Sequence, residues 1–176
     1  GYRPLDRFPT ERIAPTECDN FYRKQQLIGY VHDETACFFG GVQGNAGLFS
    51  NANDLAKLCQ MWLNKGTYGN ERILSPKTVE LFLTEKSSTS RRGLGFDKPD
   101  MENPEKSPTA IEASASTIGH LGFTGTCFWI DPEQELIYIF LCNRVYPSRT
   151  HDALSQLNIR PELFSTIYRS IKNHSK

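Results

Sequence analysis

The segment 119–144, GHLGFTGTCFWIDPEQELIYIFLCNR, constrains the fold more than any other part of the chain. Its second half, about 135–143, is apolar on both faces of an extended strand, and such a strand must be covered on both sides. The turn DPEQE joins it to a preceding strand at about 119–130, so the two are expected to pair antiparallel. The two apolar faces are Leu136, Tyr138 and Phe140 on one side, and Ile137, Ile139 and Leu141 on the other.

Helical periodicity elsewhere in the chain provides the expected cover. We predict one helix from an N-cap at Ser50 to Gly66, a second from a cap at Ser75 to about Glu85, and a third over about 159–173. Their apolar positions are Leu55, Leu58, Cys59 and Trp62; Val79, Phe82 and Leu83; and Leu163, Phe164, Ile167, Tyr168 and Ile171. The predicted class is therefore α+β, with an antiparallel sheet flanked by helices.

The remaining segments carry weaker signals. Residues 1–26 are rich in proline and arginine, which favours extended chain on the surface. The glycines of 29–50 argue against any regular element there. RRGLGF at 91–96 is a candidate short strand beside the hairpin, and the polar stretch 97–118 has the length of a lid or a disordered loop.

Length and charge limit the classes of protein. A chain of 176 residues, 38% of them hydrophobic, can bury about two thirds of its unfolded surface, as one domain or a large piece of one. Twenty basic residues balance twenty acidic ones, so no nucleic-acid partner is expected. No apolar run approaches the roughly 18 residues of a membrane-spanning helix, and the first residues lack the apolar core of a signal peptide.

The cysteines and histidines do not form a metal-binding pattern. The five cysteines are odd in number, and most lie among apolar residues, so free thiols are expected. There is no Cys-x-x-Cys motif, and the four histidines are scattered along the sequence. We therefore expect neither a structural metal nor a cofactor.

Three glycines, at 119, 122 and 125, interrupt the first strand of the hairpin. Glycine weakens a strand unless another group approaches its backbone closely. If the strand is continuous, His120, Gly122 and Thr124 share one face, along which an acyl group or a peptide could lie. The alternative is that the glycines relieve crowding against the helices and that His120 is a buried histidine whose hydrogen-bonding groups are satisfied. Spacing alone leaves both interpretations open.

Four segments together resemble the serine beta-lactamase-like family, which includes class C beta-lactamases, penicillin-recognising DD-peptidases and related esterases. They are GGVQGNAGLFSNANDLAKL, ILSPKTVELF, RRGLGFD and GHLGFTGTCFWIDPEQELIYIFLCNRVYP. The combination of a GLFS helix start with an H-x-G-F-T-G strand is the most specific of these features. The resemblance extends from about Arg12 to the C-terminal helix.

This resemblance implies a set of active-site residues. The third motif of the family, Lys-Thr-Gly or His-x-Gly, matches at His120 and Gly122, and Phe123 takes the next position, whose N–H is one of two oxyanion-hole donors. His120 would hold a substrate carboxylate or tune the catalytic lysine and tyrosine. Thr124 and Gly125 would contact the substrate.

The chain also departs from the pattern of the family. The nucleophile motif Ser-x-x-Lys occurs nowhere in the sequence, and Tyr-x-Asn matches only at 68–70, which we interpret as a tight turn. In the family both motifs precede the part that matches here, so residues 1–176 are expected to be the C-terminal portion of one beta-lactamase-like domain. Leu121 in place of the middle threonine favours an esterase or peptidase-like relative over a beta-lactamase.

Two functions are compatible with these observations. The first is part of a serine hydrolase that acts on an ester, an amide or a peptidoglycan-like substrate by acyl-enzyme chemistry and is inactive alone. The alternative is a non-catalytic accessory module of a larger enzyme, such as a family-three glycoside hydrolase (beta-N-acetylglucosaminidase). An upstream Ser-x-x-Lys in the parent protein would separate them. The resemblance also implies a periplasmic or extracellular location.

Three further expectations concern the surroundings of this strand. His32 and Asp33 could contact substrate, or Asp33 could form an Asx turn and His32 pack within a loop. Arg91 and Arg92 could bind a carboxylate or lie in a solvated loop. If the first strands of the sheet are absent, the strand ending at 142–144 has an open edge, which would bind the N-terminal half of the domain or a second copy.

Overall fold

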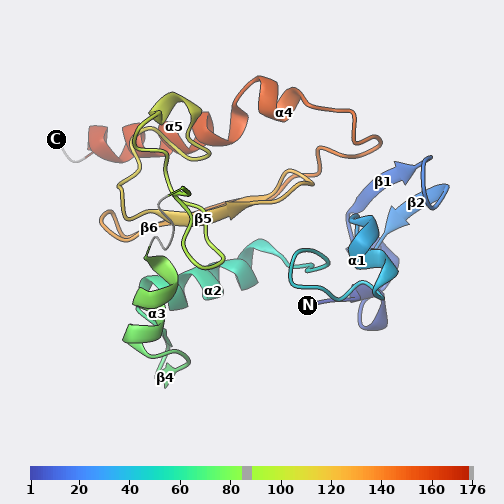
Figure 1. Cartoon of the computed structure of the whole chain (residues 1–176), viewed down its shortest axis with the longest axis horizontal. Helices are drawn as coiled ribbons and strands as arrows, with labels where there is room; N and C mark the ends of the chain where they lie inside the picture. The colour runs from blue at the N-terminus through green and yellow to red at the C-terminus, as the bar shows by residue number, and fades with distance from the viewer. Residues whose placement is uncertain (85–88, 175–176) are drawn as a thin grey trace. The chain divides into compact units, whose positions relative to one another are not determined.

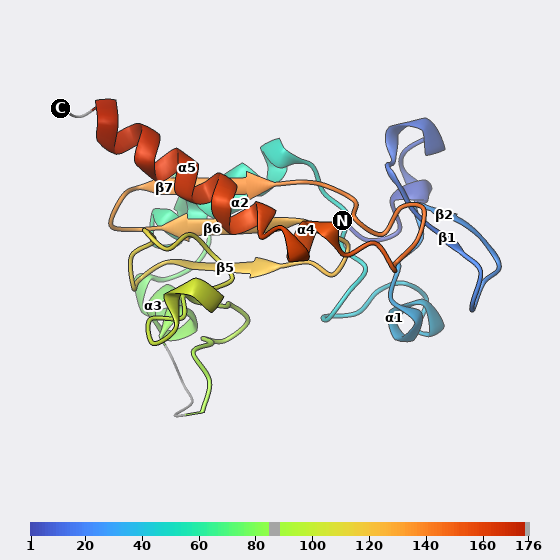
Figure 2. The same cartoon turned by 90° about the horizontal axis from the view of Figure 1, so that it is seen from above.

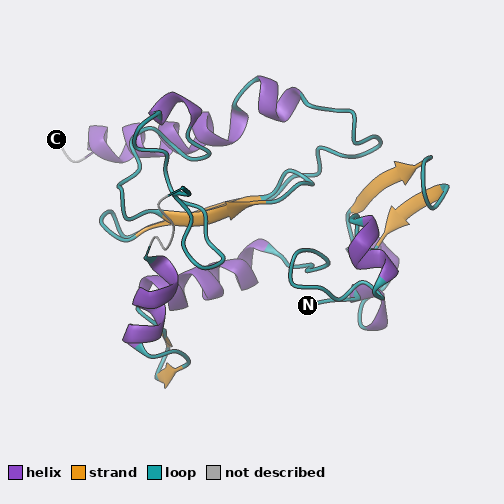
Figure 3. Cartoon of the chain, in the orientation of Figure 1, coloured by secondary structure: helices purple, strands orange, loops and turns teal. Residues whose placement is uncertain are grey.

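The computed structural model describes residues 1–84 and 89–174, and the chain forms two compact units. Unit 1 consists of Gly1–Asn51, Phe123–Thr126 and Leu141–Leu154, and unit 2 contains the intervening segments and the C-terminal part. Helices and strands follow one another along the chain in small groups of one kind (Figure 3).

The centre of unit 2 is a three-stranded sheet. Its strands β5 (Ile118–Leu121), β6 (Cys127–Asp131) and β7 (Leu136–Phe140) are antiparallel, and they lie in that order. Trp129 on the middle strand pairs with Gly119 on one side and with Tyr138 on the other. The predicted α+β class and the antiparallel pairing around the DPEQE turn are confirmed.

Helices cover both faces of this sheet, as its apolar strands require. Helix α2 (Ala52–Leu63) packs on β6 and β7 from one side, and α5 (Ile159–His174) crosses the other face (Figures 1 and 2). The Tyr138 and Phe164 rings stack with centroids 4.5 Å apart and planes inclined by 8°. Burial of such rings supplies most of the favourable free energy of a core this small.

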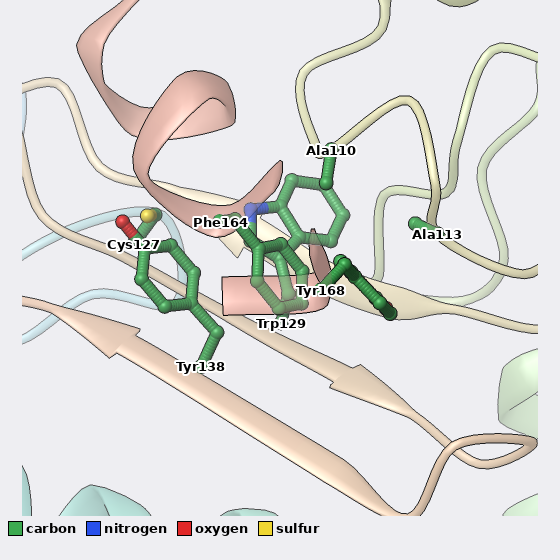
Figure 4. Close-up of a cluster of buried hydrophobic side chains, with 7 residues drawn as sticks. All are labelled: Ala110, Ala113, Cys127, Trp129, Tyr138, Phe164 and Tyr168. Carbon is green, nitrogen blue, oxygen red and sulfur yellow. The ribbon is translucent and has the colours of Figure 1, made fainter. Parts of the chain in front are cut away.

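Each face has its own hydrophobic cluster. The cluster under α5 contains Ala110, Ala113, Cys127, Trp129, Tyr138, Phe164 and Tyr168 (Figure 4). The cluster under α2 contains Cys59, Phe96, Ile118 and Ile130. Burial raises the pKa of the Cys59 thiol to about 11, so this cysteine remains protonated and acts as a small apolar residue.

The predicted helices are present with small differences. Helix α2 begins at Ala52, so Ser50 is not its cap, whereas Gly66 does have the expected positive φ, of 94°. Helix α3 (Pro76–Leu83) is capped by Ser75, whose hydroxyl accepts a hydrogen bond from Thr78 N at 3.0 Å. Its predicted end, Glu85, lies outside the described residues.

The apolar face predicted for α5 is only partly buried. Phe164 and Tyr168 are fully buried, whereas Leu163, Ile167 and Ile171 are each more than a third exposed. Ser165 is instead almost fully buried. The helix therefore contacts the sheet with a narrower stripe than its sequence indicates.

Two predictions around the hairpin are wrong. The segment 119–130 is not one strand: β5 ends at Leu121, a turn occupies 122–126, and β6 begins at Cys127. RRGLGF is not a strand either, because Gly95 has a φ of 84° and Leu94 N donates to Phe82 O at the end of α3. Asp97, directly after this segment, forms an isolated antiparallel bridge with Gly119.

The stretch 97–118 is part of unit 2 and packs within it instead of forming an open lid. It contains a short 3₁₀ helix, η3 (Pro104–Lys106), and it buries Ala110 and Ala113 against the aromatic cluster. The small side chains let the backbone approach the sheet closely.

Unit 1 contains more regular structure than its sequence indicates. Its elements are η1 (Pro4–Asp6), η2 (Thr10–Arg12), the antiparallel pair β1 (Pro15–Asp19) and β2 (Gln25–Ile28), and α1 (Glu34–Phe38). Helix α1 forms within the segment predicted to be irregular, because Asp33 caps it ahead of the glycines.

The remaining expectations from the sequence concern a turn and the thiols. Strands β3 (Thr67–Tyr68) and β4 (Glu71–Arg72) form a hairpin, so residues 68–70 do lie in the predicted tight turn. All five cysteines are free, as expected. The helices of the described ranges include none that is long and apolar enough to cross a membrane.

Candidate functional site

The His-x-Gly motif lies at the end of β5 in unit 2. His120 has an exposed side chain, and its Nδ1 lies 2.7 Å from the Leu121 carbonyl oxygen. That contact restrains the orientation of the ring, and Nε2 takes no part in it. Gly122 follows the last residue of the strand. Because β5 ends here, His120, Gly122 and Thr124 do not form the continuous strand face expected from the sequence.

The chain passes into unit 1 at Phe123. The Phe123 side chain is 61% exposed. Its carbonyl oxygen accepts a hydrogen bond from Arg144 Nε at 2.8 Å, whereas its N–H has no acceptor within 1–84 and 89–174. The next carbonyl, that of Thr124, accepts from Arg144 N at 2.9 Å. The carbonyl oxygens of Phe123 and Thr124 are therefore occupied, and the N–H of Phe123 is available.

Two of the three glycines are explained by atoms of the chain itself. A Cβ at Gly119 would overlap Phe128 O and lie 2.5 Å from Trp129 Cε3. A Cβ at Gly125 would lie 2.6 Å from Cys142 Sγ, and the φ of 113° disfavours a side chain there. Crowding therefore accounts for these two glycines, but it comes mainly from a neighbouring strand and a cysteine, not from the helices as expected, and His120 is exposed, not buried.

His32 lies in unit 1 beside the turn. Its ring stacks on Phe123 with centroids 5.3 Å apart, and its Nε2 lies 2.7 Å from Glu17 Oε2. Its side chain is only 9% exposed, and its carbonyl oxygen accepts from Arg23 at 2.7 Å. The packed alternative is thus the one observed, although the ring reaches the candidate site.

Asp33 serves as a helix cap. Its Oδ1 accepts a hydrogen bond from Ala36 N at 2.7 Å. This is the local turn chemistry that the sequence offered as the alternative to substrate contact. Arg91 likewise pairs with a neighbour, Asp97, at 2.8 Å.

Three charged residues around the turn had no assigned role in the sequence analysis. Arg149 donates through Nε and Nη2 to the Glu17 carboxylate at 2.9–3.1 Å, and its Nη2 also lies 2.8 Å from Glu34 Oε1. Burial would raise the pKa of Glu17, but hydrogen bonds from Arg149 and His32 hold it below its ordinary value. Arg144 is the third. The signal in the sequence that could have indicated Arg144 is its position directly after the predicted apolar strand, 135–143.

Two cavities among the described residues lie away from this motif. One of about 210 Å³ includes Thr109, Ser165 and Arg169 in its lining, and one of about 330 Å³ is lined mainly by Tyr22, Phe38 and Phe39. His120 and Phe123 line neither.

The chain is thus an α+β protein in which strand β5 carries His120 and the following turn has an available N–H at Phe123. A family model described as Beta-lactamase matches residues 3–159. The chain therefore belongs to the beta-lactamase family, and the predicted resemblance is confirmed.

Curated relatives agree with this assignment. Proteins named "Putative D-alanyl-D-alanine carboxypeptidase" from Salmonella paratyphi B (strain ATCC BAA-1250 / SPB7) and Salmonella newport (strain SL254) are 38% identical over 144 residues, which is 81% of this chain. The match spans 32% of each relative, about a third of its length. A solved structure titled "Crystal structure of putative beta-lactamase from Bacteroides dorei DSM 17855" is 19% identical, with a TM-score of 0.42 over 68% of this chain and 41% of that one.

Proposed function

We propose that this chain is part of a serine hydrolase that cleaves an ester or amide through an acyl-enzyme. It supplies the His-x-Gly strand at His120 and Gly122 and one oxyanion-hole donor, the N–H of Phe123. The carrying observation is that this N–H has no acceptor within the described residues while the carbonyl of the same residue is held by Arg144.

The chemistry of the proposal follows from the charge that develops during acyl transfer. A fixed N–H aimed at the forming oxyanion contributes about 3 kcal/mol of transition-state stabilisation. His120 supports the step by contacting the carboxylate of the substrate or the catalytic base. The nucleophile must come from outside these residues, because the sequence contains no Ser-x-x-Lys.

For the substrate we propose a peptidoglycan-like peptide with a free carboxylate. The support is the name of the relatives, D-alanyl-D-alanine carboxypeptidase, together with Leu121 in the middle position of the motif. A periplasmic or extracellular location would match that substrate.

Acylation by a fluorescent penicillin provides the test. The complete gene product, with a Ser-x-x-Lys segment, should form a stoichiometric covalent adduct, and residues 1–176 alone should form none. His120→Ala in the complete gene product should slow acylation by about 10²-fold, whereas Ser148→Ala, at a partly exposed loop position, should not. An adduct on residues 1–176 alone would refute the proposal.

The absence of Ser-x-x-Lys also favours a second candidate, a non-catalytic accessory module of a larger enzyme. In that case the complete gene product would lack the motif and form no adduct. Substrate binding without acylation, measured by calorimetry with a peptidoglycan pentapeptide, would then support the accessory role.

A further inference from the structure

Arg144 contacts Phe123 in the turn through both the carbonyl oxygen and the ring of that residue. Its Nε donates to Phe123 O at 2.8 Å, and its guanidinium carbon lies 4.5 Å from the centroid of the Phe123 ring. Its Nη1 donates to the carbonyl oxygens of Arg149 and His151 at 3.2 and 2.8 Å. One planar group thus joins the turn to the segment 149–151.

These contacts close into a circuit of five residues. Starting at Phe123, the ring stacks on His32, His32 bonds to Glu17, and Glu17 accepts from Arg149. The carbonyl of Arg149 accepts from Arg144, which returns to Phe123 through both its ring and its carbonyl. Segments distant in sequence therefore fix one peptide group together.

The circuit acts on the peptide group next to the proposed donor. Phe123 is 61% exposed, so packing alone does not hold it. A hydrogen bond to its carbonyl oxygen and two contacts to its ring restrict the rotations that would turn the N–H away. Misplacement of a reacting or stabilising group by about 1 Å costs roughly 10²-fold in rate.

We propose that Arg144 is a positioning residue that, with His32, Glu17 and Arg149, fixes the orientation of the Phe123 N–H. The catalytic consequence rests on the proposed function, whereas the positioning of the turn does not. Lysine is a poor substitute at 144. The planar guanidinium of Arg144 stacks on a ring and donates to three carbonyl oxygens, and a single compact ammonium group cannot make all of these contacts at once.

The test uses hydrogen–deuterium exchange in the complete gene product. Arg144→Lys should raise the exchange rate of the peptide spanning 121–127 about tenfold relative to the unsubstituted protein. The matched control is Arg72→Lys, since Arg72 also donates to two main-chain carbonyls, those of Lys65 and Leu74, but in the β3–β4 hairpin. That control should leave 121–127 unchanged. Equal protection of 121–127 in the Arg144 variant and the unsubstituted protein would overturn the positioning role.

Two further measurements separate positioning from general stabilisation. With a reporter ester, Arg144→Lys should lower kcat about 10- to 100-fold and leave KM within about twofold, because only the donor geometry changes. Free guanidinium should restore part of the kcat of Arg144→Ala, and ammonium should not. His32→Gln, which keeps a hydrogen bond to Glu17 but lacks the stacked ring, should show a smaller loss in the same direction.

The outcomes distinguish the two proposals. If the complete gene product shows no acylation, the proposed function fails, and exchange at 121–127 still decides whether Arg144 positions the turn. If kcat and KM change together, or guanidinium gives no recovery, Arg144 is only structural and the inference is refuted.

Discussion

Glu17 illustrates how a buried charge is tolerated in unit 1. Its side chain is 5% exposed, yet its two oxygens receive hydrogen bonds from the Arg149 side chain and main chain and lie against His32. A carboxylate with this many partners keeps its charge, whereas a buried carboxylate without them would be protonated. The pair contributes little net stability compared with apolar residues, but losing one member is costly.

Arg149→Met is expected to destabilise the protein by about 2–4 kcal/mol, because it leaves Glu17 buried without its main partner. This expected loss of stability is smaller than for breaking a fully buried ion pair, since the Arg149 side chain is 31% exposed. Urea unfolding followed by circular dichroism measures the change. Arg3→Met, which removes an exposed pair with Asp6, should cost less than about 1 kcal/mol. Equal effects of the two substitutions would contradict this account.

The same group predicts a pH dependence. Because the pKa of Glu17 is lowered in the folded state, its contribution is fully present above the ordinary value of 4.5 and is lost as pH falls below it. Glu34 and Asp131 have lowered pKa values too and act in the same direction. Unfolding free energy measured from pH 7 to pH 3 should therefore decrease, with a shallower slope in Glu17→Gln. An unchanged slope in that variant would show that Glu17 is not responsible.

At the scale of elements, the β5–β6 hairpin requires a glycine at position 119 of β5, because residues of the paired strand β6 occupy the space of a side chain there. Gly119 lies against the Trp129 indole, which is fully buried. The indole fills space that a side chain on β5 would otherwise occupy. Close approach of the two strands is therefore coupled to the packing of the aromatic cluster under α5.

Gly119→Ala should destabilise unit 2 by about 3 kcal/mol, near the upper end for overpacking, because the new methyl group meets backbone as well as the indole. Gly44→Ala is the control, since nothing lies within 4 Å of its Cβ position, and it should change stability by less than about 0.5 kcal/mol. Thermal denaturation followed by Trp fluorescence reports both. A melting temperature for Gly119→Ala equal to that of the control would refute the crowding.

The sequence predicts a helix or strand well where local periodicity or capping determines it, and poorly where contacts between residues distant in the chain determine it. The two-faced strand β7 and the Ser75 cap follow from period and capping chemistry, and both are observed. The break of 119–130 at Gly122 depends on a turn in which Arg144, from elsewhere in the chain, donates a hydrogen bond to the Phe123 carbonyl oxygen. Motif spacing in the sequence identified His120 and Phe123. It could not identify Glu17 and Arg149, because their contact joins residues 132 positions apart. Nor could it identify Arg144, because its bond to Phe123 depends on the conformation of the turn.

At the scale of the whole molecule, β7 is an edge strand with the composition of a central one. It reads LIYIF, with no charge or proline to protect the edge, and no described strand pairs with its outer side. Edges of this kind associate readily with another strand. We propose that the occupant is a strand of the same domain that precedes these residues, and a second copy of the chain when that strand is missing.

Residues 1–176 alone should consequently self-associate. Light scattering at increasing concentration should show dimers or larger species, and Leu141→Lys, which places a charge directly after β7, should shift association to higher concentration. Leu157→Lys is the control, because Leu157 is also an exposed leucine but lies between α4 (Ala153–Gln156) and α5. A stable monomer at all concentrations would contradict the open edge.

The interleaving of the two units has a consequence for how the protein folds. The chain leaves unit 1 after residue 51, returns for 123–126, leaves again, and returns for 141–154. Unit 1 cannot be completed until most of unit 2 has been synthesised, and joining its segments requires closing long loops, which slows folding. Because each unit consists of three separate segments, cleavage of the chain at a single peptide bond cannot separate either unit as a whole. Both units are therefore expected to fold late and to unfold together, so that a nascent chain stopped before residue 123 remains incomplete in each.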